Sequence, residues 1–124
     1  MKTAELTGAH LDYWCARAEG VLPEQLEIRQ VQRGTDYHCV LVAPRMDGAA
    51  TAVGVMDYST RWAMGGPLML KHQVECRSYS LDNWHARCPM KFSGYVQGGT
   101  PLEAICRAVV RAAFGDEVED VPCA

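Results

Sequence analysis

The spacing of apolar residues predicts a helix at the start of the chain. The residues that recur every three or four positions between 3 and about 19 are Leu6, Ala9, Tyr13 and either Ala16 or Arg17. Thr3 is suited to the N-cap of this helix, because its hydroxyl can accept a backbone hydrogen bond. Gly20 follows at the position where a glycine commonly ends a helix.

A second helix is predicted near the end of the chain, with clearer signals. Thr100 can cap it, Pro101 suits its first position, and Glu103 completes a capping box. The apolar stripe that follows consists of Leu102, Ile105, Cys106, Val109, Val110 and Ala113. The helix is expected to end at Phe114-Gly115, and the acidic tail at about 116–124 is expected to lie loosely on the surface.

Shorter apolar runs between the two helices predict strands. The candidates are residues 26–31, 37–42, 51–56, 73–79, 83–87 and 92–96, with a hairpin turn at Arg33-Gly34-Thr35-Asp36 and a loop at 44–50. The continuously apolar run 37–42 is typical of a central strand, and 73–79 alternates as a half-buried strand should. The elements predict an α+β fold: an antiparallel sheet of about four or five strands, with both terminal helices packed on one face.

Length and composition indicate one globular domain over residues 1–124. The chain is 48% hydrophobic and 22% charged, which is the composition of a folded protein. Its first residues lack the apolar core of a signal peptide, and no apolar run approaches the roughly 20 residues that span a bilayer. We therefore expect a cytosolic protein without a membrane partner.

Charge and cysteine content narrow the function classes further. The net charge is −3, and the chain has no basic run, so nucleic acid is not an expected partner. None of the six cysteines forms a Cys-x-x-Cys unit, and no secretion signal is present. Free and mostly buried thiols are therefore expected.

One group of residues raises the question of a metal site. His72, Cys76, His85 and Cys88 lie within seventeen residues and could bind zinc if a hairpin brought them together. Their spacing matches no familiar zinc knuckle, however. Buried cysteines and surface histidines are the preferred interpretation, with no metal or other cofactor.

Catalytic motifs are absent from the sequence. It has no nucleophile elbow, P-loop, His-Glu-x-x-His or Rossmann glycine pattern. His85 and Cys88 could meet across a turn, but nothing supplies a third, orienting group. His38 and Cys39 are neighbours on a predicted strand and therefore point to opposite faces. A protein without enzyme activity is expected.

Residues 58–68 combine aromatic, hydroxyl and arginine side chains with a Gly-Gly-Pro turn. Adjacent Gly65 and Gly66 allow positive φ and leave backbone N–H groups uncovered, which predicts a rigid, donor-rich loop. Arg61 could hold a phosphate or carboxylate. Trp62, and Trp84 outside this segment, are either core residues at a sheet edge or the walls of a cleft. Such a loop suits binding better than catalysis.

Several segments, in order along the whole chain, carry a resemblance to a known family. They are residues 3–9, 11–14, 16–20, 58–59, 62–68, 84–86, 99–108 and 114–118. In these segments the chain resembles a NinX-like family of small phage and prophage proteins of unknown function. That family often has an aspartate before the central tryptophan, whereas this chain has Thr60-Arg61, so a basic role becomes plausible there.

The resemblance implies a phage accessory protein that acts against host defence. The leading hypothesis is a homo-oligomeric protein that binds and sequesters a small nucleotide-like signal molecule. Its expected ligand-binding residues are Tyr58, Ser59, Arg61, Trp62, Gly65, Gly66 and Trp84. One alternative is an inhibitor that binds a host defence protein through an exposed tryptophan. Another is a small enzyme or metal-binding protein built on the histidine and cysteine group.

Overall fold

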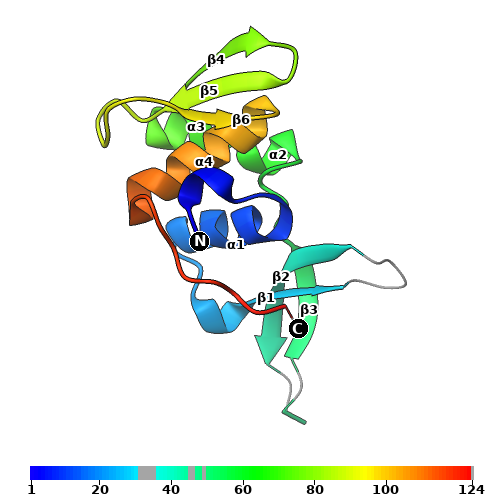
Figure 1. Cartoon of the computed structure of the whole chain (residues 1–124). Helices are drawn as coiled ribbons and strands as arrows, with labels where there is room; N and C mark the ends of the chain where they lie inside the picture. The colour runs from blue at the N-terminus through cyan, green and yellow to red at the C-terminus, as the bar shows by residue number, and fades with distance from the viewer. Residues whose placement is uncertain (31–35, 45–46, 49, 124) are drawn as a thin grey trace.

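Two small sheets and two long helices form the fold (Figure 1). The structure, a computed structural model, describes residues 1–30, 36–44, 47–48 and 50–123. The helices are α1 (Gly8–Ala18), α2 (Trp62–Gly65), α3 (Pro67–His72) and α4 (Pro101–Phe114), with 3-10 turns at Thr3–Glu5 and Pro23–Gln25. The strands are β1 (Leu26–Gln30), β2 (Tyr37–Pro44), β3 (Ala50–Val55), β4 (Glu75–Ser80), β5 (Asn83–Arg87) and β6 (Val96–Gly98).

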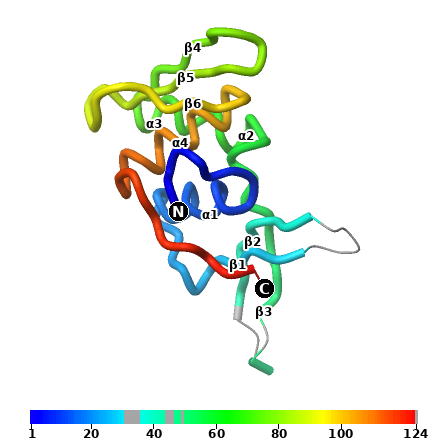
Figure 2. The backbone as a smooth tube through the Cα atoms, in the orientation of Figure 1, coloured from blue at the N-terminus to red at the C-terminus, as the bar shows by residue number. Residues whose placement is uncertain are grey.

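The elements stack as sheet, helix, helix and sheet. In Figures 1 and 2, the β4-β5-β6 sheet lies on α4, α4 lies on α1, and α1 lies beside the β1-β2-β3 sheet. The expected α+β class is confirmed. The prediction of one sheet with both helices on one face was wrong. Residues 62–72 form the short helices α2 and α3 after β3. Strand β4 therefore begins on the side of α4 that faces away from α1 (Figure 1).

Strand pairing is antiparallel throughout both sheets. The prediction that 37–42 forms a central strand is confirmed, because β2 lies between β1 and β3. Residues 33–35 of the predicted turn and residues 45, 46 and 49 of the predicted loop lie outside the described residues; of the ends of that loop, Pro44 belongs to β2 and Ala50 to β3. The strand predicted at 92–96 instead begins at Val96, since the N–H groups of Lys91 and Phe92 turn back onto the Cys88 carbonyl, at 2.9 and 3.2 Å.

The two terminal helices begin differently from one another. The capping signals of α4 are confirmed: the Thr100 hydroxyl accepts from the Glu103 N–H at 3.1 Å. Helix α1 begins only at Gly8, however, so the prediction of Thr3 as its N-cap was wrong. Thr3 is buried and donates its hydroxyl to the Gly115 carbonyl at 2.7 Å. Gly20 follows the end of α1 with φ of 92°, as expected.

The acidic C-terminal segment does not lie loosely on the surface. Its backbone pairs with the N-terminal residues, through Thr3 N–H to Asp116 O at 2.8 Å and Val118 N–H to Met1 O at 2.9 Å. It then runs along α1, and Cys123 forms a parallel bridge with Ile28 of β1 (Figure 2). The expectation was wrong because it considered the segment's acidic side chains and not its backbone donors and acceptors.

The core lies between the two sheets and is centred on α1 and α4. Its largest fully buried apolar side chains include Leu6, Leu11, Ile28, Val40, Ile105, Val109 and Val110. The cysteines are free, and Cys15, Cys39, Cys88 and Cys106 are buried, as the sequence predicts. Among the described residues, no helix is long and apolar enough to cross a membrane.

Candidate functional site

The Gly-Gly-Pro segment is helical and does not form the expected open loop. Gly65 donates its N–H to the Arg61 carbonyl at 2.8 Å, and Gly66 donates to the Trp62 carbonyl at 2.9 Å. Neither glycine has positive φ, and Gly66 has helical angles of −56° and −47°. The expectation of uncovered N–H groups at these glycines was therefore wrong.

Close packing explains why a glycine stands at position 65. A Cβ placed there would overlap the Tyr58 carbonyl oxygen and would lie 2.8 Å from Cδ2 of Leu102. Gly65 is buried where α2 meets this carbonyl and the start of α4. This glycine therefore serves the packing of the segment rather than anion binding.

Tyr58 and Ser59 belong to the core as well. Both are buried, and the Ser59 N–H donates to Oδ1 of Asp12 on α1 at 2.8 Å. The pKa of Asp12 is raised to about 6, chiefly because its carboxyl is buried; hydrogen bonds from Ser59 oppose the rise, and the nearby charge of Asp57 contributes to it. The two residues expected to offer hydroxyl contacts are thus buried, and the backbone N–H of Ser59 joins the segment to α1.

The buried carboxyl predicts a distinctive pH dependence of stability. Between about pH 4 and 6 the folded state keeps the Asp12 proton that the unfolded state releases, so the free energy of unfolding falls as pH rises. The loss from this group is about 3 kcal/mol and is complete above pH 6. Asp12→Asn keeps an oxygen acceptor for Ser59 and cannot ionise. In urea unfolding at pH 4 and pH 7, the variant should gain about 3 kcal/mol relative to wild type at the higher pH; parallel profiles would contradict this.

Two of the expected ligand-binding residues are exposed beside a shallow groove. Trp62 is 54% exposed, and the side chain of Arg61 is 61% exposed. The groove, of about 260 Å³, is lined by Ser59, Thr60, Trp62, Thr100, Pro101 and Leu102. Nη1 of Arg61 lies 3.9 Å from Oδ1 of Asp57, at the limit of an ion pair. We call this feature the Trp62 groove.

Trp84 lies elsewhere, on β5. It shares a strand face with Ala86, which is buried, and its half-buried ring packs against the core. Its Nε1 donates to the Leu81 carbonyl at 3.4 Å. This position matches the interpretation of Trp84 as a core residue at the sheet, whereas Trp62 is mostly exposed.

The histidine and cysteine group is divided between the two faces of the β4-β5-β6 sheet. Cys76 pairs with Ala86 on the helix side, and His85 pairs with Arg77 on the opposite side. Burial raises the pKa of Cys76 and of Cys88. In the described part of the chain, no three His, Cys, Asp or Glu side chains are placed to hold a metal ion.

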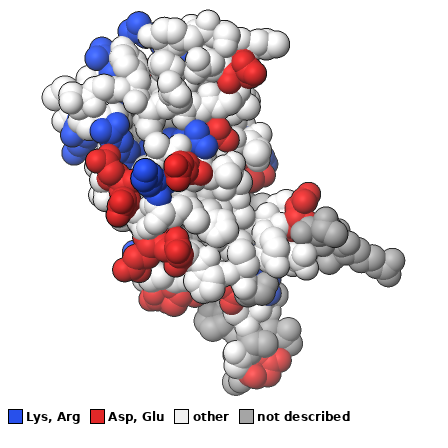
Figure 3. Space-filling view, viewed as in Figure 1, with Lys and Arg blue, Asp and Glu red and all other residues white. Residues whose placement is uncertain are grey.

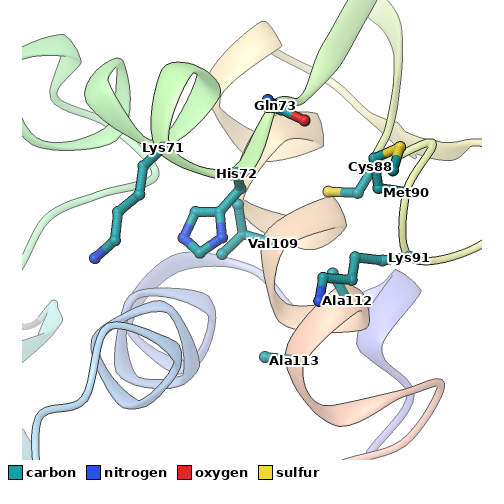
Figure 4. Close-up of a pocket in the computed structure, with 9 residues that line it drawn as sticks. All are labelled: Lys71, His72, Gln73, Cys88, Met90, Lys91, Val109, Ala112 and Ala113. Carbon is teal, nitrogen blue, oxygen red and sulfur yellow. The ribbon is translucent and has the colours of Figure 1, made fainter.

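His72 and Cys88 instead line a pocket beside α4 (Figure 4). Its volume is about 330 Å³, and its lining includes the ammonium groups of Lys71 and Lys91 beside the imidazole of His72. Glu19 forms an ion pair with Lys71 and a hydrogen bond with His72, whose Nε2 lies 3.0 Å from its Oε1. Burial alone would raise the pKa of Glu19, but the hydrogen bonds from Lys71 and His72 lower it. The charge of Lys71 is therefore already balanced by Glu19.

The face of the β4-β5-β6 sheet that points away from α4 carries tyrosine and histidine rings next to guanidinium groups. We call this set the outer-face cluster; its members are Arg77, Tyr79, His85, Arg87 and Tyr95. The Tyr79 and His85 rings lie 4.0 Å apart between centroids, and Nη2 of Arg77 donates to the Tyr95 hydroxyl at 2.6 Å. The guanidinium carbons of Arg77 and Arg87 each lie 5.0 Å from the centre of the Tyr95 ring.

The cluster is accessible and is only partly neutralised. Tyr79 is 55% exposed, and Nε2 of His85 is buried without a hydrogen-bond partner among the described residues. Nε of Arg87 pairs with Glu75 at 2.7 Å, while Arg77 has no carboxylate partner in the part of the chain that the structure describes. On the face shown in Figure 3, Lys and Arg side chains lie mainly in the half with β4–β6 and α4, and Asp and Glu dominate the other half.

This cluster was not predicted from the sequence, although the signal for most of it was present. The strands predicted at 73–79 and 83–87 place Arg77 with Tyr79, and His85 with Arg87, on common faces through simple alternation. Their pairing across β4 and β5 then joins the two sets, because Arg77 lies opposite His85. Tyr95 had no such signal, since it lies just before β6.

Comparison with known proteins places almost the whole chain in one family. A family model described as Bacteriophage P22, NinX matches residues 2–112. The matched region includes the Trp62 groove and the outer-face cluster. No curated protein matches the chain.

Proposed function

The chain belongs to the bacteriophage P22 NinX family, and from this membership we propose that it is a non-catalytic phage accessory protein of the host cytosol. Its role would be to bind and sequester a small nucleotide-like molecule that serves host defence. The observation that carries this proposal is the outer-face cluster, which combines exposed aromatic rings with guanidinium groups on one sheet face.

The base and the phosphate of a nucleotide each have a chemical counterpart in the cluster. The exposed ring of Tyr79 offers a face on which a base can stack, a contact that does not depend on base identity. The guanidinium of Arg77 is a planar donor suited to phosphate oxygens. Because Arg87 already pairs with Glu75, it would contribute more weakly. The cluster therefore favours an anionic ligand with an aromatic ring.

Thiol chemistry supports a binding role over a catalytic one. Burial raises the pKa of Cys39 to about 12, and it also raises the pKa of Cys76 and Cys88. These thiols stay protonated near neutral pH, and a thiol is a far weaker nucleophile than a thiolate. Binding without chemical change is the proposal, with no metal or cofactor.

A ligand panel tests this function directly. The purified protein would be screened by thermal shift and calorimetry against mononucleotides, dinucleotides and cyclic nucleotides, with metal content measured alongside. We expect saturable binding of at least one nucleotide and its recovery, unaltered, after denaturation of the complex. The absence of binding across the panel would contradict the proposal, and recovery of a changed ligand would replace it with catalysis.

A second candidate, inhibition of a host defence protein, is favoured by the exposure of Trp62. Tryptophan is enriched among the residues that dominate binding energy at protein interfaces, and this one lies beside a groove. Wild type and Trp62→Ala would be compared as baits in host lysate, with Leu70→Ala as a matched exposed control. A host protein held by wild type and the control but lost from Trp62→Ala would support this role.

A further inference from the structure

The pocket beside α4 has an apolar floor, and we call it the α4 pocket. Helix α4 contributes Val109, Ala112 and Ala113, and the short alanine side chains leave a hollow between α4, the end of α3 and the loop after β5. Cys88 closes the hollow on the sheet side, where its Sγ donates to the Ala108 carbonyl of α4 at 3.7 Å. Val109 and Cys88 are fully buried. The volume of about 330 Å³ is sufficient for a small organic molecule.

Of the two ammonium groups that line the α4 pocket, only that of Lys91 is available to a ligand. Lys71 is paired with Glu19 and extends away from the other lining residues (Figure 4). Lys91 has no carboxylate partner in the part of the chain that the structure describes. Its charge acts on the floor of the pocket, since it opposes part of the rise that burial causes in the pKa of Cys88. The pocket therefore combines one free positive charge with an apolar floor.

The backbone that carries Lys91 is held in place against α4. The N–H groups of Lys91 and Phe92 both donate to the Cys88 carbonyl, at 2.9 and 3.2 Å. The Phe92 ring in turn lies under the guanidinium of Arg111 on α4, with 4.5 Å from the guanidinium carbon to the ring centre. A ligand would therefore have to order only the side chain of Lys91 and not the loop, which lowers the entropic cost of binding.

We propose that the α4 pocket is a second binding site, which takes a small ionised carboxylic acid with an apolar body. The carboxylate pairs with Nζ of Lys91, and the apolar body covers Val109 and Ala112 on the floor. A single carboxylate matches the one available ammonium, whereas a phosphate dianion would bring a second charge without a partner. No member of the outer-face cluster lines this pocket, so the site is additional to the one proposed for nucleotides.

NMR titration with hexanoate and benzoate tests the site, with hexan-1-ol and hexylamine as probes that lack the carboxylate. At least one of the two acids should bind saturably, with amide shifts that gather at residues 72–73, 88–91 and 109–113. Hexan-1-ol should bind about tenfold more weakly than hexanoate, because it cannot pair with the ammonium, and hexylamine should not bind. The absence of saturable binding by both acids, or equal binding of hexanoate and hexylamine, would overturn the proposal.

Three variants separate the charge of the pocket from its hollow. Lys91→Gln should weaken binding of the acid about tenfold, whereas Lys2→Gln, the matched control outside the pocket, should bind as wild type does. Ala113→Leu fills the hollow from an exposed position, so it should block binding without lowering the melting temperature. Equal losses in the two lysine variants, or unchanged binding by Ala113→Leu, would overturn the proposal. Lys91→Gln should bind nucleotide as wild type does, so failure of this site and failure of the nucleotide proposal give different results.

Discussion

Gly65→Ala should destabilise the protein by roughly 3 kcal/mol, because the site has no room for a methyl group. The new Cβ would overlap the Tyr58 carbonyl oxygen and press on Cδ2 of Leu102, at 2.8 Å. The first neighbour is backbone, which cannot rotate away as a flexible side chain can. The segment would therefore have to shift, and with it the hydrogen bond that joins Ser59 to Asp12.

Urea unfolding of paired variants measures this effect. Gly99→Ala is the matched control, since its nearest neighbour is 3.8 Å away and its N–H bond to Glu103 is kept. We expect the control to remain within about 0.5 kcal/mol of wild type. If Gly65→Ala were as stable as the control, the packing account of the Gly-Gly-Pro segment would be contradicted.

Local signals in the sequence predicted the terminal helices and most strands correctly. The caps of α4, the position of Gly20 just after the end of α1, and the bounds of β5 follow from residues close together in sequence. The division into two sheets does not follow from such signals. It depends on residues 62–72 being helical. Glycine at position 65 usually disfavours a helix, but here only glycine fits against the Tyr58 carbonyl, and this contact cannot be read from the local sequence.

The candidate site was predicted less well than the fold. Trp62 and Arg61 are exposed as a binding role requires, but Tyr58 and Ser59 are buried and Gly65 is packed. Residue type alone could not distinguish the exposed residues from the buried ones, because a hydroxyl group or a glycine occurs both in protein cores and in binding sites. The outer-face cluster, in contrast, depends on register between β4 and β5, which fixes which side chains are neighbours.

Arg77→Ala should lower the affinity for a bound nucleotide by roughly tenfold to a hundredfold. Hydrogen bonds to charged groups contribute about 1.5–3 kcal/mol, and each 1.4 kcal/mol is a factor of ten in affinity. Arg77 is exposed and has no carboxylate partner among the described residues, so its removal leaves no buried charge behind. Its contact with the Tyr95 hydroxyl would be lost, with little effect on the fold.

Isothermal titration of the variants with one nucleotide checks this prediction. Arg61→Ala removes another exposed guanidinium, beside the Trp62 groove, and should bind as wild type does. Tyr79→Ala should weaken binding through loss of the stacking ring. Equal losses in Arg61→Ala and Arg77→Ala would indicate a non-specific charge effect, and a loss only in Arg61→Ala would move the site to the groove.

The central claim is that an aromatic anion binds on the outer face of the β4-β5-β6 sheet. Its most direct test is NMR mapping, in which amide and imidazole shifts are followed during titration with a nucleotide that binds in the panel. We expect the changes to gather at residues 77–79, 85–87 and 95 and to include the ring of His85. Changes that gather at residues 61–62 and 100–102, or an unchanged spectrum with every nucleotide tried, would contradict it.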